Sequence, residues 1–248
     1  MKPLTGRTVV VTRPRPEADE LARLLERRGA RALVAPAIEL TPVRTAALTK
    51  ALADLADGAF EWVTLTSPRT VDVLAEHLQP KQVRAKVAAV GEGTADAYHR
   101  WTRRRPDLIP KAFTTASLGR AFPGGSGRVL TPRADLAPEG LEDALERKGW
   151  RATRVDAYRT RMARSLPAEA RAALRLGEVD AVTFTSASTV RGFVRAMGTV
   201  RDSPKVVVIG PVTAREARAH GLHVRAIASP HTIDGLVAAV ERVLGSRR

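Results

Sequence analysis

The sequence predicts an α/β protein built from two flavodoxin-like or Rossmann-like parallel-sheet domains. Short β-branched runs alternate with amphipathic helical stretches, which is typical of parallel sheets covered by helices. The same order of motifs occurs twice along the chain. With 248 residues, of which 44% are hydrophobic, the chain is long enough for two modest cores.

Three segments of the first half recur in the second half, always 119 or 120 positions later. Internal repeats of this kind indicate that one structural unit has been duplicated. The recurring pairs are 13–29 with 133–149, 64–71 with 183–190, and 87–95 with 206–214.

Within the first copy the pattern predicts five strands separated by helices. The strands are expected near 7–12, 31–35, 61–66, 86–90 and 107–109. The helices are expected near 16–28, 45–56, 68–78, 93–103 and 115–122. Ligands bind such layers in the loops that leave the carboxyl ends of the strands, so these loops are the candidate sites.

The chain is strongly basic, with 41 Lys and Arg against 26 Asp and Glu and a net charge of +15. A charge of this size attracts polyanions, either nucleic acid or a small molecule with several carboxylates. The basic residues are scattered along helical segments and only 4% of residues are aromatic, so few side chains could stack on bases. Nucleic acid is therefore the less favoured ligand.

Composition argues against several classes of site. The chain has no cysteine, which excludes disulfides, zinc thiolates and iron–sulfur clusters. The five histidines form no His-x-x-x-His pair, so no metal is expected. No apolar run approaches the roughly 18 residues of a spanning helix, and the N-terminus lacks a signal-peptide core. We expect a soluble, cytoplasmic protein without membrane contact.

Two glycine-rich segments do not fit the known nucleotide-binding motifs. Residues 91–96 lack the third glycine of a dinucleotide fingerprint and follow the fourth strand instead of the first. Residues 124–128 have no Gly-Lys-Ser/Thr ending and are predicted to form a turn between the two copies. A nicotinamide, flavin or P-loop site is therefore rejected.

In both copies a strand ends in Thr-Ser and passes directly into a helix, at Thr66-Ser67 and at Thr185-Ser186. Hydroxyls at a helix start can cap the free amides, and those amides can also hold an anion. Capping alone explains a single case, but the recurrence leaves capping and anion binding about equally favoured. Residues 91–94 and 210–213 follow strands with a glycine, which lets a ligand approach the backbone.

Taken together, these motifs resemble the uroporphyrinogen-III synthase family over almost the whole chain. Each motif is short, but their order and spacing make the resemblance specific. The matching segments are Val10-Val11-Thr12-Arg13-Pro14, Thr66-Ser67, Val90-Gly91, Tyr158-Arg159-Thr160, Phe184-Thr185-Ser186 and Ile209-Gly210-Pro211-Val212-Thr213.

The resemblance implies two α/β domains joined by a two-stranded ladder, with the chain crossing over once and returning. Each domain then takes the opening of one copy and the remainder of the other. The expected ranges are 1–37 plus 161–248 for domain 1, 40–157 for domain 2, and 36–40 with 155–161 for the ladder.

The resemblance also implies a cyclising hydro-lyase of porphyrin biosynthesis, which serves haem, sirohaem and cobalamin. The implied substrate is hydroxymethylbilane, four linked pyrroles with carboxylates on every ring. Its hydroxyl leaves as water, an azafulvene forms, and a spiro intermediate opens and recloses with ring D inverted. No cofactor is implied, a monomer is expected, and hydroxymethylbilane synthase is a candidate transient partner.

Tyr158 is the candidate catalytic residue, because it matches the tyrosine that the family places in its cleft. A phenol is a neutral donor at pH 7 and could help the hydroxyl depart. The alternative is a strand aromatic that packs between domains, since strands favour tyrosine and the equivalent position holds Ile38.

The candidate substrate-binding residues lie in the loops after the strands. Hydroxyls and helix-start amides could hold carboxylates there, and guanidinium groups could pair with them, although a solvated surface role is an equal alternative for each arginine. These residues are Arg13, Thr66, Ser67, Gly93, Thr94, Arg133, Ser186, Ser188 and Thr213.

Two other functions stay open. Two similar lobes around a cleft also describe a non-catalytic cytoplasmic ligand-binding module. The high calculated pI, near 11.3, keeps a nucleic-acid-binding protein as a third possibility, which a steep salt dependence of DNA affinity would favour.

Overall fold

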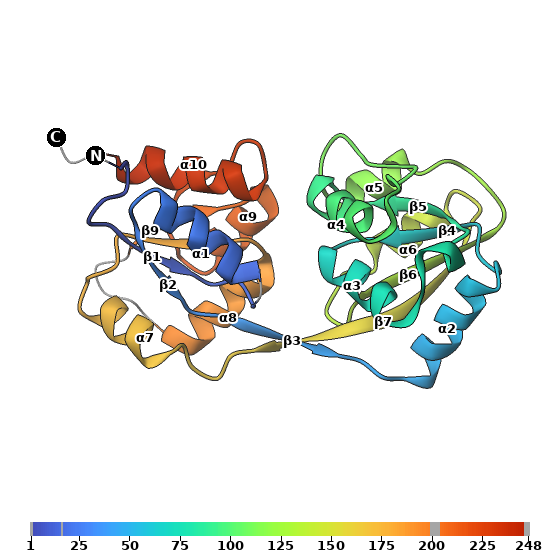
Figure 1. Cartoon of the computed structure of the whole chain (residues 1–248), viewed down its shortest axis with the longest axis horizontal. Helices are drawn as coiled ribbons and strands as arrows, with labels where there is room; N and C mark the ends of the chain where they lie inside the picture. Colours follow the sequence, from blue (N-terminus) through green and yellow to red (C-terminus); the bar gives the residue numbers. More distant parts are fainter. Residues whose placement is uncertain (1, 16, 199–203, 246–248) are drawn as a thin grey trace. The chain divides into compact units, whose positions relative to one another are not determined.

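The structure is a computed structural model that describes residues 2–15, 17–198 and 204–245. The chain divides into two compact units, shown in Figure 1. Unit 1 is Met1–Leu40 with Arg161–Arg248, and unit 2 is Thr41–Thr160. The chain therefore passes from one unit to the other at 40/41 and returns at 160/161. The family resemblance implied a ladder between the domains at 36–40 and 155–161.

In its described residues, unit 1 contains five strands and the helices that join them. Its strands are β1 (Thr8–Val11), β2 (Arg31–Val34), β8 (Ala181–Phe184), β9 (Lys205–Val208) and β10 (Val224–Ile227). Its helices are α1 (Glu17–Arg27), α7 (Ala168–Arg175), α8 (Ala187–Met197), α9 (Pro211–Ala219) and α10 (Ile233–Leu244).

Unit 2 also consists of strands joined by helices, and two strands carry the chain from one unit to the other. The strands are β4 (Trp62–Leu65), β5 (Lys86–Ala89) and β6 (Arg128–Ala134), with β3 (Ile38–Pro42) and β7 (Arg151–Met162) as the crossing strands. The helices are α2 (Ala46–Ala56), α3 (Pro68–His77), α4 (Glu92–Thr102), α5 (Thr115–Ala121) and α6 (Gly140–Glu146), with a 3₁₀ turn at Pro80–Gln82.

Each sheet combines strands from both copies of the repeat. The sheet of unit 1 has the order β10-β9-β8-β1-β2, and its strands are parallel in register, as in Val9 opposite Ala181. The sheet of unit 2 has the order β3-β7-β6-β4-β5. Numbered along the chain, the strands of unit 1 have the 2-1-3-4-5 arrangement of flavodoxin-like folds, whereas in unit 2 the crossing strand β3 occupies one edge of the sheet. The predicted fold class, with its duplication and crossover, is confirmed.

The core of unit 1 has two layers because successive side chains of a parallel strand point to opposite faces. Val9 and Val11 pack with α1 and α10 on one face, whereas Val10 packs with α7, α8 and α9 on the other. All three valines are fully buried. A strand buried on both faces requires a continuous apolar run, which explains the Val-Val-Val of β1 and of β9.

In unit 2 an aromatic cluster fills the space between the sheet and helices α5 and α6. The ring of Phe122 lies 4.8 Å from that of Trp62 and 5.9 Å from that of Trp150, measured between centroids. Residues 124–128, the predicted turn, run past this cluster, and a Cβ on Gly125 would lie 2.1 Å from the Trp150 ring. Packing against that ring explains the glycine there.

The crossing strands β3 and β7 are neighbours and run in opposite directions. Ala163 donates its N–H to the oxygen of Ala37 at 3.0 Å, and Thr41 donates its hydroxyl to the oxygen of Arg159. Helix α8 approaches the chain just before β3 so closely that a Cβ on Gly192 would lie 2.0 Å from the Ala37 oxygen. Only glycine allows that approach.

Most predicted elements of the first copy are found within one or two residues of their predicted ends. The exception is the strand expected at 107–109, which is reduced to one bridge between Leu108 and Ala88. Residue 16, the predicted first residue of a helix, lies outside the described residues. The backbone of Asp107 and Leu108 still pairs with Val87 and Ala89, but the prolines at 106 and 110 cannot donate to a ladder and limit this strand to a short contact.

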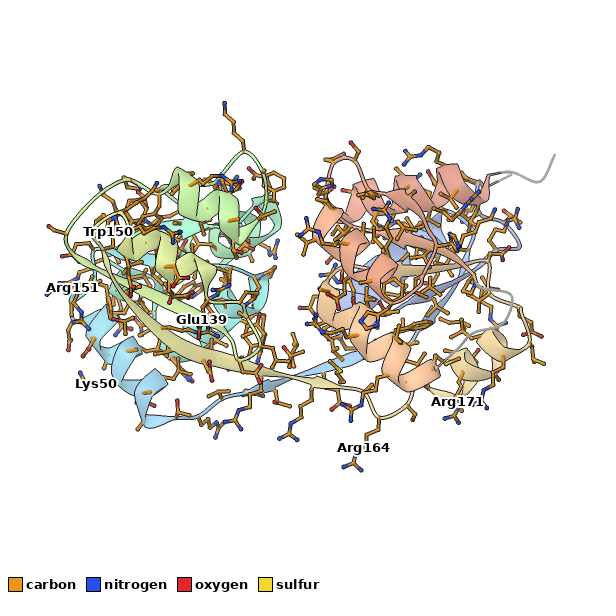
Figure 2. The ribbon with its side chains drawn as sticks, turned by 180° about the vertical axis from the view of Figure 1, so that it is seen from behind. Lys50, Glu139, Trp150, Arg151, Arg164 and Arg171 are labelled. Carbon is orange, nitrogen blue, oxygen red and sulfur yellow. The ribbon has the colours of Figure 1, made fainter. Side chains whose placement is uncertain are left out.

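Basic side chains extend from the surface of each unit. Figure 2 shows Arg164 and Arg171 of unit 1 pointing away from the ribbon. Some cations are paired, as Lys50 is with Asp54 at 2.9 Å, but exposed pairs of this kind contribute little stability. Exposed pairs on this surface therefore add little to the stability of the fold.

Candidate functional site

The candidate site of each unit lies at the carboxyl ends of its strands, where the strand order reverses. In unit 1, β1 lies beside β8, and in unit 2, β6 lies beside β4. Open α/β sheets bind ligands at these switch points. Arg13 follows β1, Ser186 follows β8, and Thr66 and Ser67 follow β4, so these predicted residues fall at the switch points.

The structure brings Ser67 and Tyr158 together in unit 2. Ser67 has extended backbone and caps α3, because its Oγ accepts the N–H of Thr70 at 3.2 Å. The Tyr158 hydroxyl lies 2.9 Å from the same Oγ, and the Thr70 hydroxyl lies 3.0 Å from it. Tyr158 is buried, with 7% of its surface exposed. The predicted cap and the predicted catalytic phenol therefore share one hydrogen-bond network.

Tyr158 is held by the backbone on both sides of its position in β7. The register partner of Tyr158 is Ala134 of β6, just past a bulge. The backbone oxygen of Tyr158 accepts the N–H of Asp135 at 3.1 Å. The Asp135 carboxylate accepts the N–H groups of Leu136 and Thr160, each at 2.9 Å. Bulges of this kind re-aim side chains at functional sites.

The start of α4 forms a second feature of this edge. No side chain caps the helix because its N-cap residue is Gly91, and a Cβ there would lie 2.9 Å from Phe113. Gly93 is exposed, and a Cβ on it would meet nothing within 4 Å. The predicted partner Thr94 is buried instead, so it faces the interior. Uncapped helix-start amides carry partial positive charge and favour an anion.

Arg133 lies inside β6 and has internal partners. It is 2% exposed, and its guanidinium donates to Glu142 at 2.8 Å and to the oxygen of Pro138 at 2.7 Å. Glu142 lies on α6 and is itself buried. The side chain that was predicted to bind substrate is thus used to join a strand to a helix.

Arg13 in unit 1 has a different environment from its repeat mate. It is half-buried, and its buried Nη1 makes no hydrogen bond within the described part of the chain. Burial lowers the pKa of Arg13, an effect opposed by the charges of Glu17 and Glu20 on α1. A partly desolvated guanidinium with an unmet donor is suited to bind an incoming carboxylate.

Ser186 and Ser188 come together at the start of α8. The Ser186 Oγ accepts the N–H of Thr189 at 3.2 Å and lies 2.9 Å from the Ser188 Oγ. The predicted Thr213, on α9, is buried. Gly210 is the N-cap of this helix and provides no side-chain cap, and Val212 next to Thr213 is 52% exposed. Unit 1 thus repeats the cap of unit 2 without a tyrosine.

Sequence reasoning missed two residues that complete the site of unit 2. Thr70 belongs to a Ser-x-x-Thr segment that recurs at Ser186 and Thr189, and this capping spacing could have identified it. Asp135 directly follows β6, but nothing in the sequence indicates that its carboxylate accepts an N–H of the neighbouring strand β7.

Other parts of the described structure offer fewer groups that could bind a ligand or take part in a reaction. A hollow of about 320 Å³ in unit 1 lies beside β2, where Arg31 pairs with Glu169 at 2.7 Å, and contains no predicted site residue. Among the described residues, no three His, Cys, Asp or Glu side chains could hold a metal ion together. In the same part of the chain, no helix combines the length and the apolar character that a membrane crossing requires.

Comparison with known proteins points to one family. The model described as Uroporphyrinogen-III synthase HemD matches residues 19–238. A uroporphyrinogen-III synthase of Synechococcus elongatus is 30% identical over 258 residues, which cover 97% of each chain. One of Chlorobaculum parvum is 27% identical and covers 92% of this chain and 95% of its own.

Solved structures agree with the observed fold. A mutant uroporphyrinogen III synthase of Thermus thermophilus has a TM-score of 0.69 at 22% identity, with 96% of this chain and 98% of that chain covered. The uroporphyrinogen-III synthetase of Helicobacter pylori has a TM-score of 0.63 at 17% identity, with 96% and 99% covered.

Proposed function

Because the chain belongs to the uroporphyrinogen-III synthase family, we propose that it cyclises hydroxymethylbilane to uroporphyrinogen III with loss of water. The protein is a cyclising lyase of porphyrin biosynthesis. The assignment of this chemistry to residues rests on the Tyr158–Ser67 pair, whose hydroxyl oxygens lie 2.9 Å apart at the carboxyl ends of the strands of unit 2.

The phenol of Tyr158 supplies a donor where the substrate hydroxyl must leave. The C–O bond breaks with its electron pair going to oxygen, which takes the phenolic proton and departs as water. The pyrrole N–H of the same ring releases its proton to solvent, so the azafulvene is neutral, and the phenolate regains a proton from solvent. A buried phenol is suited to this step because it is neutral at pH 7 and is held in place.

Each unit by itself offers groups that suit a substrate carboxylate. In unit 1 the partly desolvated Arg13 pairs with a carboxylate, with support from the buried Nη1 that lacks a hydrogen bond among the described residues. Ser186, Ser188 and the helix-start amides near Thr213 add neutral donors. In unit 2, Thr66 and the amides around Gly93 and Thr94 do the same. Arg133 is left out because Glu142 already neutralises it.

Isomer analysis tests this proposal. Purified protein is given freshly prepared hydroxymethylbilane, the products are oxidised, and uroporphyrins I and III are resolved by chromatography. We expect predominantly type III, because the enzyme holds the chain in the geometry for ring inversion. Only type I, formed at the rate of the protein-free control, would favour the non-catalytic binding module instead.

The tyrosine has a matched control, since Tyr98 and Tyr158 are the two tyrosines of the chain. Tyr158→Phe is expected to lower kcat about tenfold, which is less than the usual loss of ~10²-fold or more for a positioned acid because azafulvene formation is intrinsically easy. Tyr98→Phe, in the interior of α4, is expected to leave turnover unchanged. Unchanged turnover in a folded Tyr158→Phe variant would remove this phenol from the mechanism.

We also propose that the protein works as a cytoplasmic monomer that meets hydroxymethylbilane synthase transiently. The absence of cysteine suits a reducing compartment. Light scattering during size-exclusion chromatography tests the monomer, and a lower yield of type I from a coupled reaction than from free hydroxymethylbilane tests the transient contact.

A further inference from the structure

The hydrogen bonds of Ser67 constrain each other, because a hydroxyl has one hydrogen and two acceptor positions. One acceptor position is taken by the N–H of Thr70 at 3.2 Å. The remaining acceptor position and the single hydrogen face the hydroxyls of Tyr158 and Thr70, at 2.9 Å and 3.0 Å. One of these two hydroxyls must therefore donate to Ser67 while the other accepts from it.

This constraint couples the direction of the Tyr158 hydrogen bond to Thr70. When Ser67 donates to Thr70, Tyr158 donates to Ser67. When Thr70 donates to Ser67, the Ser67 hydrogen bonds the phenol oxygen, and the phenolic hydrogen is not used in the bond to Ser67. The hydroxyl of Thr70 is fully buried, where hydrogen bonds are strong and act cooperatively.

The equivalent cap of unit 1 does not have this freedom. Thr189 donates its hydroxyl hydrogen to the backbone oxygen of Ser186 at 2.8 Å, which fixes the direction of the hydrogen bonds at that cap. The Ser186 Oγ contacts Ser188 instead of a phenol, and the position equivalent to Tyr158 holds Ile38. One copy of the repeat therefore retains a simple helix cap, and the other contacts the candidate catalytic residue.

From this contrast we infer that Thr70 and Ser67 form a hydroxyl relay that turns the Tyr158 phenol toward the departing oxygen. The inference rests on the proposed function. As the phenolic proton moves to the leaving oxygen, Ser67 donates a hydrogen bond to the phenol oxygen and Thr70 donates to Ser67. Ser67 is then a positioning residue, and its hydrogen-bonding capacity is filled by protein groups instead of a substrate carboxylate.

A double-mutant cycle tests the relay. Ser67→Gly removes the hydroxyl and costs α3 little, because glycine is an adequate N-cap. We expect kcat to fall about fivefold, a typical effect of one lost hydrogen bond, with KM unchanged. In the Tyr158→Phe background the same change should have no further effect on kcat, because the relay acts only through the phenol. Ser67→Thr should restore most of the lost turnover.

Thr45→Gly is the matched control for loss of a cap. Thr45 also caps a helix of unit 2, accepting the N–H of Leu48 at 3.2 Å. This variant should keep wild-type kcat, and thermal unfolding should show that both glycine variants remain folded.

Three results would overturn the inference while leaving the proposed function intact. These are multiplicative effects of the two changes on kcat, a raised KM with unchanged kcat in Ser67→Gly, and equal loss of turnover in Thr45→Gly. Each would make Ser67 an independent ligand or a structural cap. Wild-type protein without type III activity would instead overturn the function and the relay together.

Discussion

The clearest effect of a single side chain on stability is expected at Tyr98, on the inner face of α4. Its side chain is fully buried, and its hydroxyl makes no hydrogen bond within the described residues. Burying a polar group without a partner costs about 1–3 kcal/mol. We expect Tyr98→Phe to raise the free energy of unfolding by about 1 kcal/mol at pH 7, measured by urea denaturation. A loss of stability would show that the phenol has a partner.

The same residue predicts a dependence on alkaline pH. Burial raises the pKa of Tyr98 above its usual value, because the anion would be desolvated. In the unfolded chain the phenol ionises above about pH 10, while in the folded protein it stays neutral. The unfolded state loses its proton first, so the free energy of unfolding falls as pH rises from about 10 toward the folded pKa. In Tyr98→Phe this fall should be shallower, and equal slopes would contradict the assignment.

At the scale of residues, sequence reasoning predicted which positions follow the strands but not the contacts that each side chain makes there. Arg13 and Arg133 are equivalent in the repeat, yet Arg13 has an unmet donor and Arg133 is neutralised by Glu142. The partner comes from a loop and helix after β6 whose contacts are set by tertiary packing. Hydroxyls such as Thr94 follow the pattern of a cap, but the cap is Gly91.

Elements were more predictable than contacts, because their signals are local. Buried β-branched runs specify the strands, and Ser67 and Ser186 begin α3 and α8 as capping chemistry requires. The pairing of strands from different copies depends on the crossover at β3 and β7. Composition and spacing do not encode that crossover, so only the family resemblance indicated it.

The start of α4 supports a prediction about an element. Gly93→Ala introduces no clash within the protein and improves helix propensity, so stability should be unchanged or rise by up to about 1 kcal/mol. The new methyl group would nevertheless obstruct a carboxylate approaching the uncapped amides. We expect KM to rise about fivefold, the effect of one hydrogen bond, with kcat little changed.

Gly140→Ala serves as its control in steady-state kinetics. Gly140 begins α6 in the same unit, is exposed, and likewise has open space around its Cα. Its substitution should leave both kinetic constants unchanged. If Gly93→Ala also left KM unchanged, the substrate would not approach this helix start.

At the scale of the whole molecule, the net charge of +15 has a measurable consequence. The proposed substrate carries carboxylates on every ring, so the field of the protein raises its local concentration and its rate of association. Raising ionic strength from about 10 mM to about 150 mM shortens the Debye length from ~30 Å to ~8 Å and screens this attraction. KM should therefore rise severalfold over this range, while kcat stays constant because the contacts in the bound complex are short.

Steady-state kinetics with sodium chloride, repeated with double-stranded DNA as a competitor, checks this expectation. A KM independent of salt would mean that Arg13 and the backbone donors bind substrate without long-range attraction. Stronger binding to DNA than to the bilane would indicate that the basic surface binds nucleic acid.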